Sequence, residues 1–138
     1  MNYKLNESKM FSDITEGIAI VINSLTGVYY GMNSFGTIVF DNLISGSSVE
    51  EIVSTVKAIP GAPADIEKRV ALFVSTLENF EIIITAEDSI PRMPVIDSSV
   101  ATSDAFIPEC KEYKDVQELL FADPIHDVKV DEGWQPGK

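Results

Sequence analysis

The sequence predicts an α+β fold in which a three-stranded antiparallel sheet is followed by three helices. Two changes in hydrophobic periodicity support this prediction. Isoleucines alternate with smaller residues from Ile18 to Ile22, which is the period of a strand. From Asn33 onward apolar residues recur three or four positions apart, which is the period of a helix. Pro60 and Pro63 then interrupt the helical pattern and separate two helices from a third.

The predicted sheet is a meander of the segments 10–14, 17–23 and 28–32. Asn23 and Gly27 supply turn chemistry between the second and third strands, because asparagine bonds its own backbone and glycine takes positive φ. The first eight residues are polar, and we expect them to be frayed.

The three helices have recognisable ends. Asn33 is a plausible N-cap of the first helix, and Gly46 ends it. Ser47 or Ser48 caps the second helix, which has two glutamates in its first turn. The third helix is predicted over 64–79, with Asp65 as its cap, and a short strand follows at 81–85.

Composition divides the chain into a domain at 1–86, a linker at 87–105 and an acidic tail at 106–138. The linker is rich in proline, serine and acidic residues, so we expect it to be extended. The tail is predicted to be partly ordered, with a short amphipathic helix over 112–121.

Net charge and residue counts exclude several classes of protein. The formal net charge is −12, which disfavours nucleic acid and favours a cationic peptide or a basic patch on an enzyme as partner. The sequence has no apolar run that could cross a membrane and no secretory h-region, so a cytoplasmic location is expected. The single cysteine, Cys110, can form no internal disulfide.

Candidates for chemistry are few. His126 lies between Asp123 and Asp127 in sequence, which leaves a metal site as one hypothesis and a structural or recognition role as the other. Gly36 and its neighbouring glycines lack the spacing that cradles phosphate, and Gly36 is expected to let the first helix pack closely on the hairpin. We therefore predict no catalytic residues, no bound metal and no cofactor.

The run LTGVYYGMNSFGTIVFDNLISGSSVEEIV, residues 25–53, resembles the PqqD-like family, also described as RiPP recognition elements. Gly31-Met32 and Phe40 depart from the residues common in that family but keep its apolar character. The resemblance implies a small winged-helix-like domain that binds the leader segment of a precursor peptide. A second resemblance, over 113–134, is to an Asp-Pro-Ile-His-Asp-Val…Gly-Trp tail found in a subset of the family.

The edge of the predicted sheet is the candidate site, because an unpaired strand accepts another chain by β-strand addition. The resemblance implies that the leader peptide lies antiparallel to the strand at 28–32, against the third helix. The predicted peptide-binding residues are Val28, Tyr29, Tyr30, Met32, Val70, Phe73, Val74 and Leu77.

The tail itself could be a ligand of this groove. The tail has short apolar anchors separated by polar residues, as in a leader peptide: Phe106-Ile107-Pro108, Tyr113 and the pair Leu119-Leu120. The tail could therefore occupy the groove of its own domain or of a second copy, and be displaced by the true substrate. The alternative is that it packs elsewhere or stays disordered.

Together these observations predict a peptide chaperone of natural-product biosynthesis that is not itself an enzyme. It would bind a precursor peptide and present it to a separate modifying enzyme, and it could form a dimer. Two other hypotheses are a winged-helix regulator that contacts DNA or a transcription partner, and a metal-dependent enzyme that uses the segment 123–127.

Overall fold

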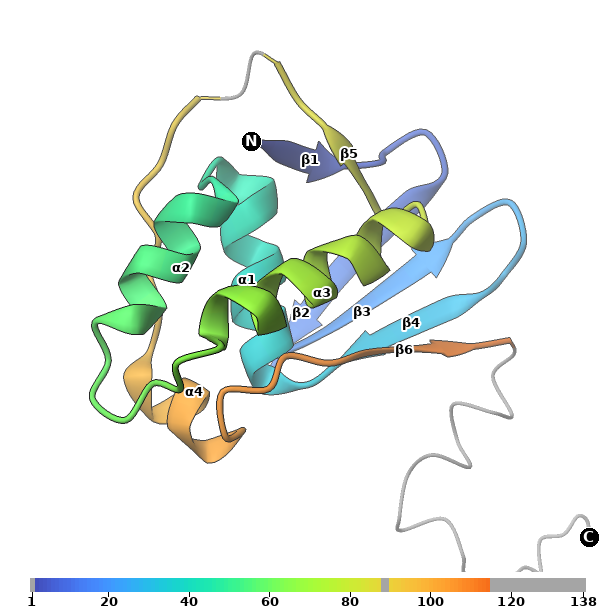
Figure 1. Ribbon diagram of the computed structural model, residues 1–138. Helices are drawn as coiled ribbons and strands as arrows, with labels where there is room; N and C mark the ends of the chain where they lie inside the picture. The colour runs from blue at the N-terminus through green and yellow to red at the C-terminus, as the bar shows by residue number, and fades with distance from the viewer. Residues whose placement is uncertain (1, 88–89, 115–138) are drawn as a thin grey trace, which may run out of the picture.

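The computed structural model describes residues 2–87 and 90–114. In chain order the elements are β1 (Tyr3–Leu5), β2 (Met10–Thr15), β3 (Ile18–Asn23), β4 (Tyr29–Met32), α1 (Ser34–Ser45), α2 (Val49–Lys57), α3 (Ile66–Asn79), β5 (Ile83–Thr85), α4 (Ser98–Ser103) and β6 (Cys110–Tyr113). Figure 1 shows α3 lying across the sheet, with α1 behind it and α2 and α4 at one end. Within the described part of the chain, no helix is long and apolar enough to cross a membrane.

The main sheet has four antiparallel strands in the order β2-β3-β4-β6. The prediction of a β2-β3-β4 meander is confirmed, but the prediction of a three-stranded sheet is wrong, because β6 pairs with the outer edge of β4. Local periodicity could not show this, since β6 lies about 80 residues further along the chain and carries mostly polar side chains.

A second, two-stranded sheet joins the two ends of the predicted domain. β1 pairs antiparallel with β5, and Leu5 lies opposite Ile83. The prediction that the first eight residues are frayed is therefore wrong for Tyr3–Leu5. Tyr3 is buried, so this short strand is fixed by packing that its polar neighbours in sequence did not reveal.

The ends of the first two helices follow the sequence closely. The Asn33 side chain accepts a hydrogen bond from the Gly36 amide at 2.8 Å and caps α1. Ser48 and Glu51 form a capping box at α2. The third helix begins at Ile66 with Asp65 as its N-cap residue, but the Asp65 side chain makes no capping hydrogen bond. Its carboxylate instead forms an ion pair with Arg69 at 2.9 Å.

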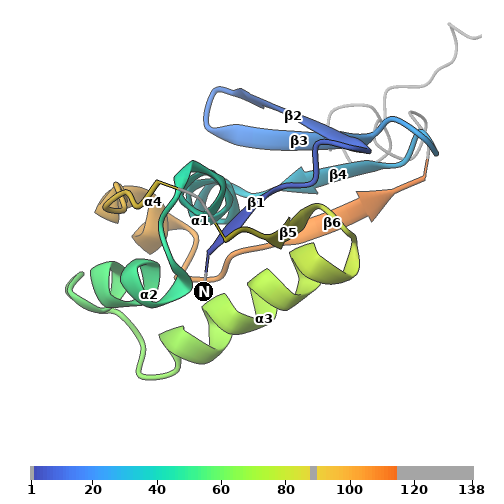
Figure 2. The same ribbon diagram turned by 90° about the horizontal axis from the view of Figure 1, so that it is seen from above.

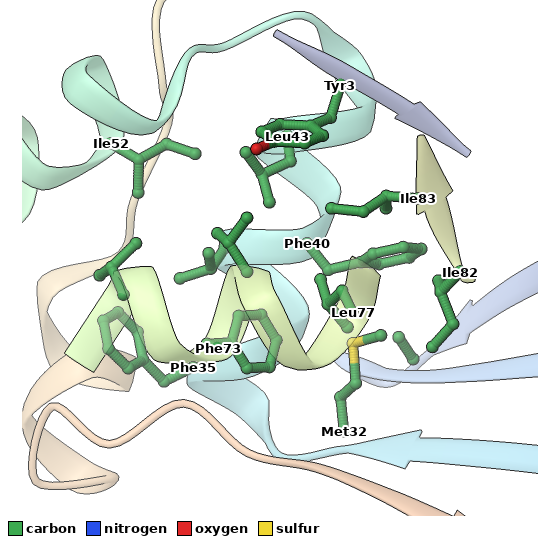
Figure 3. Packing of buried hydrophobic residues seen from close by; sticks show 14 of the residues in the cluster. Tyr3, Met32, Phe35, Phe40, Leu43, Ile52, Phe73, Leu77, Ile82 and Ile83 are labelled. Atoms are coloured by element: carbon green, nitrogen blue, oxygen red, sulfur yellow. The ribbon is translucent and has the colours of Figure 1, made fainter. Parts of the chain in front are cut away.

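One continuous core lies between α1, α3 and the inner faces of the two sheets. Figure 3 shows Phe40 of α1 beside Leu77 of α3, Leu43 further along α1, and Ile82 and Ile83 on the side of the short sheet. All five of these side chains are at most 2% exposed. Burying side chains of this size contributes about 1.5–3 kcal/mol each, so the core dominates the stability of the fold.

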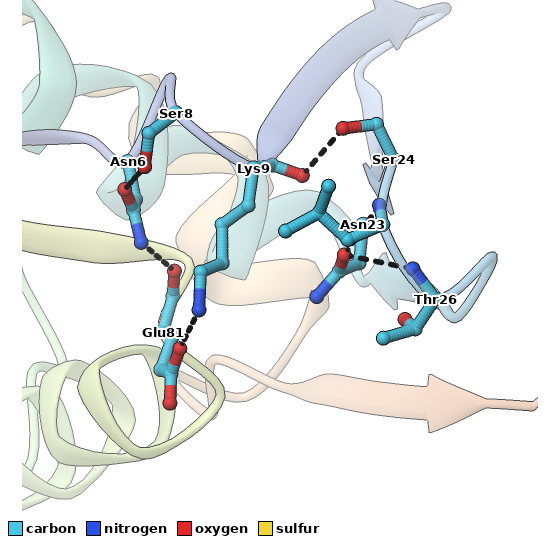
Figure 4. Close-up of polar contacts among 8 residues, drawn as sticks. Asn6, Ser8, Lys9, Asn23, Ser24, Thr26 and Glu81 are labelled. Carbon is cyan, nitrogen blue, oxygen red and sulfur yellow. Dashed lines mark hydrogen bonds and ion pairs between the residues drawn. The ribbon is translucent and has the colours of Figure 1, made fainter.

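A polar corner ties the N-terminal hairpin to the end of α3 (Figure 4). The Asn6 side-chain amide donates to the Glu81 carbonyl at 3.0 Å, and Lys9 forms an ion pair with the Glu81 carboxylate. Asn23 Oδ1 accepts from the Thr26 amide at 3.2 Å in the β3–β4 turn, as its turn propensity predicted. These contacts fix the β2–β3 hairpin relative to α3.

The predicted linker is not simply extended. It contains α4, which packs against α1, and its preceding residues are tied to α1 by side chains. Asn42 exchanges hydrogen bonds with the Val95 backbone at 2.9 and 3.0 Å, and Ser47 Oγ donates to the Arg92 carbonyl at 2.7 Å. A Cβ at Gly46 would lie 2.2 Å from the Ile90 carbonyl oxygen, so this glycine both ends α1 and admits the crossing chain. The domain limits at 86 and 105 stay predictions.

Candidate functional site

The edge of β4 that was expected to be open is covered by β6. The two strands are antiparallel, and Figure 2 shows β6 between β4 and α3. The paired residues are Tyr29 with Tyr113, Tyr30 with Glu112, Gly31 with Lys111, and Met32 with Cys110. An extended segment of the chain therefore lies where the leader peptide was expected.

Side chains of β6 alternate between the two faces of the sheet. Cys110 and Glu112 lie on the same face as their buried partners Met32 and Tyr30, which is the face toward α3. Tyr113 lies on the opposite face, where its ring comes within 3.4 Å of a Cβ built at Gly31. The half-buried and exposed pattern of β6 shows that none of its side chains enters the core completely.

Asn33 connects the start of α1 to the segment that leads into β6. Its side-chain amide donates to the Ile107 carbonyl at 2.8 Å, and its Oδ1 accepts from the Glu109 amide at 2.9 Å. Its own backbone amide donates to the Glu109 carbonyl at 3.2 Å. The residue that caps α1 thus also bonds three backbone groups of the incoming strand.

Gly36 lies under the same segment. A Cβ at this position would be 2.7 Å from the Glu109 carbonyl oxygen and 2.8 Å from Asn33 Oδ1. Any larger residue would displace the strand or the cap, because Cβ contacts below 3.0 Å do not occur without movement. The expected close packing of Gly36 exists, but its partner is the Glu109 backbone and not the hairpin.

The segment before β6 is anchored to the helices. Asp104 accepts a hydrogen bond from the Phe35 amide at 2.7 Å, and the Phe106 ring lies edge-on to the Phe35 ring with centroids 6.4 Å apart. Arg69 of α3 donates to the Ala105 carbonyl at 3.1 Å. Ala105 and Phe106 both have positive φ, 54° and 58°, and turn the chain from α4 into the groove.

A cavity of about 350 Å³ remains between α3 and the segment leading into β6. Its lining combines one face of α3 with the strand, namely Arg69, Leu72, Phe73, Thr76, Ile107, Pro108, Glu109, Cys110 and Lys111. Leu72 is 61% exposed and Ile107 46% exposed, so the cavity has apolar walls that are open to solvent.

The structure places the predicted peptide-binding residues in three positions. Tyr30 and Met32 are buried on the inner face of β4, whereas Val28 and Tyr29 are half-buried near its start. On α3, the residues Val70, Val74 and Leu77 belong to the core, while Phe73 is buried and also lines the cavity.

Three further α3 residues on the cavity, Arg69, Leu72 and Thr76, were not predicted. The sequence prediction chose the apolar stripe of the helix, and that stripe faces inward. Leu72 lies beside the stripe and is exposed, and an apolar residue just outside a core stripe is the signal that could have identified the groove.

Two ionisable side chains at the groove, Cys110 and Tyr30, have raised pKa values. Burial raises the pKa of the Cys110 thiol to about 12, so the thiolate needed for nucleophilic chemistry is scarce. Burial, and then the negative charge of Glu112, raise the pKa of Tyr30. Within residues 2–87 and 90–114, no group of three or more His, Cys, Asp or Glu side chains could hold a metal ion. The candidate metal ligands Asp123, His126 and Asp127 lie outside the described residues.

The predicted tail lies partly within the described residues, up to 114, and partly outside them. The expected helix at 112–121 is wrong at its start, because Glu112 and Tyr113 belong to β6. The rest of that helix, and the tail motif that ends at Trp134, lie outside the described residues.

Comparison with known proteins agrees with the resemblance. Residues 19–83 match the family "Coenzyme PQQ synthesis protein D (PqqD)". No curated protein matches the chain. Among solved structures, "TbiB1 in Complex with the TbiA(beta) Leader Peptide" matches with a TM-score of 0.53 and 23% identity, covering 62% of this chain and 99% of that one. The segment from β3 to the start of β5 therefore matches the PqqD family, and the fold is similar to that of a protein solved with a leader peptide.

Proposed function

We propose that this protein binds the leader segment of a ribosomally synthesised precursor peptide as an added strand on β4. The observation that carries the proposal is the pairing of an extended segment with β4, in the space bounded by α3. This pairing supports the ability of the site to accept a peptide in strand conformation. The match of residues 19–83 to PqqD and the leader peptide bound to TbiB1 support the same interpretation.

In this proposal the β4 edge and the α3 side of the groove have different roles. Main-chain bonds to β4 supply affinity for any extended chain, and the cavity beside Leu72 and Phe73 selects among side chains. A site of this kind binds in the micromolar to nanomolar range, about −8 to −12 kcal/mol. The net charge of −12 favours a leader that carries positive charge.

We infer that the bound peptide is presented to a separate modifying enzyme, as the family resemblance implies. Peptide delivery needs an accessible complex and no chemistry by the carrier.

The test begins with tagged full-length protein purified from its native cells, followed by mass spectrometry of the peptides and proteins that accompany it. The peptide found is then synthesised, and its affinity is measured by fluorescence anisotropy. We expect Leu72→Ala to weaken binding about three- to tenfold, because it removes an exposed wall of the cavity.

Leu25→Ala is the matched control, since Leu25 is 72% exposed in the β3–β4 turn and lies outside the cavity lining. Equal affinities for the parent and both variants would remove the groove from the proposal. Co-purification of nucleic acid without any peptide would contradict the function itself.

A further inference from the structure

The proposed peptide and β6 require the same edge of β4. The family match ends at residue 83, so the segment that contains β6 lies outside the part of the chain that matches PqqD. A peptide can pair with β4 only after β6 has left it. While it is paired, β6 therefore blocks peptide binding at this edge.

We propose that residues 107–113 are an internal ligand of the groove, displaced by an incoming extended peptide that carries a small apolar side chain at the position of Cys110. This proposal rests on the proposed function, since it names how access to that site is regulated and which feature of the peptide is read. Its structural basis is the β4–β6 pairing together with the contacts of Asn33.

The contacts of residues 107–113 are of the kind that another peptide can replace. The four residues of β6 are half-buried or exposed, and Ile107 is 46% exposed. In residues 107–113, Asn33 bonds to backbone groups, namely the Ile107 carbonyl and the amide and carbonyl of Glu109. Every extended peptide presents the same groups, so an incoming chain can satisfy Asn33 and the β4 edge without copying the sequence of β6.

The residues just before the internal ligand have contacts that a short peptide does not replace. Phe106 is 6% exposed, and Asp104 is bonded to the start of α1. Ala105 and Phe106 form a bend with positive φ at which the strand can separate from its anchor. After release the segment stays tethered, and a short tether gives it an effective concentration of about millimolar order.

The position of Cys110 indicates which kind of side chain the groove selects in a bound peptide. Cys110 lies opposite Met32, on the face toward α3, and both it and Phe73 line the cavity. A charged side chain at this position would lose solvation against apolar walls. A displacing peptide is therefore expected to carry alanine, cysteine or valine there.

Proline variants of full-length protein can release β6 selectively. Antiparallel strands bond at alternate residue pairs, and the Asn33 amide bonds to the Glu109 carbonyl. The pair Gly31–Lys111 is then a bonded pair, whereas the Glu112 amide points away from β4. Lys111→Pro removes a bond of the ladder, and Glu112→Pro is its matched control on the same strand.

Two measurements follow release. Cys110 is the single cysteine of the chain, so its alkylation by iodoacetamide at pH 8 reports exposure of β6. We expect alkylation at least tenfold faster in Lys111→Pro than in the parent, and a rate within threefold of the parent in Glu112→Pro. The second probe is a labelled synthetic peptide of residues 107–113 carrying Cys110→Ala, which should bind Lys111→Pro at least tenfold more tightly than the parent.

Equal alkylation rates in all three proteins would overturn the proposal, and so would faster alkylation without tighter binding of the probe. Circular dichroism establishes that each variant is folded. If Lys111→Pro is not, Tyr113→Pro, which breaks the next bonded pair, takes its place.

A precursor peptide captured from cells distinguishes failure of the displacement proposal from failure of the proposed function. A peptide that binds the parent and accelerates Cys110 alkylation supports both. Binding without acceleration leaves the function standing and overturns displacement. Absence of any captured peptide, with tight binding of the probe to Lys111→Pro, contradicts the function and supports the internal ligand.

Discussion

β5 and β6 are both added after α3, and both pair antiparallel with a strand from the N-terminal half of the chain. β5 follows α3 directly and brings Ile83, 2% exposed, into the core. β6 arrives after a long connection along α1, and its side chains stay half-buried or exposed. The difference teaches that backbone pairing alone does not make a strand integral to a fold. Ile83 holds β5 in the core, whereas the proposal that β6 is replaceable rests on side chains that are at most half-buried.

Breaking β5 should have the largest effect. Ile83→Ala leaves a cavity in the core, and we expect it to lower the free energy of unfolding by about 2–5 kcal/mol. Denaturant titration followed by circular dichroism measures this loss. Ile84→Ala is the control on the same strand, because Ile84 is 40% exposed and should change stability by less than about 1 kcal/mol. Equal losses would mean that β5 is not fixed by burial.

Gly36→Ala tests how closely β6 approaches α1. The new Cβ would meet the Glu109 carbonyl oxygen at 2.7 Å, so we expect faster Cys110 alkylation and a stability loss of about 1–3 kcal/mol. Ser34→Ala, at the first residue of α1, is the control and should leave alkylation unchanged. Alkylation at the parental rate in Gly36→Ala would show that the strand tolerates the added atom.

Two asparagines allow the contacts of the groove and those of the connection before it to be tested separately. Asn33→Ala should cost about 1–2 kcal/mol and expose Cys110, because it removes the α1 cap and the bonds to Ile107 and Glu109. Asn42→Ala removes the bonds to Val95 and should leave Cys110 protected. Alkylation measured beside denaturation separates these outcomes, and equal protection of Cys110 in both variants would contradict the assignment.

Alkaline pH should have the smallest effect. Burial raises the pKa of Cys110 to about 12 from an ordinary value of 9.0, so the folded state favours the neutral thiol. Its contribution to stability is complete below pH 9 and is lost as pH rises toward 12. We expect the free energy of unfolding to fall slightly more between pH 8 and 10 in the parent than in Cys110→Ala. Parallel pH profiles would show that Cys110 is not buried when β6 is paired with β4.

Local sequence accounts well for the β2–β4 meander and the helix ends. Residues 18–22 show the period of a strand. The capping box of α2 joins Ser48 and Glu51, which are close in sequence. Of the predicted peptide-binding residues on α3, Phe73 lines the cavity, whereas Val70 and Leu77 belong to the core, and whether any of them binds a peptide stays a prediction. Distinguishing core from groove required knowing which side of α3 meets β6.

The sequence by itself determined the elements whose causes lie within a few residues: strand period, turn chemistry, helix caps and the apolar stripe of α3. Only the tertiary structure decided that β1 pairs with β5 and that β6 fills the edge of β4. Those pairings join segments about 80 residues apart through backbone groups that every residue carries, so no local pattern encodes them.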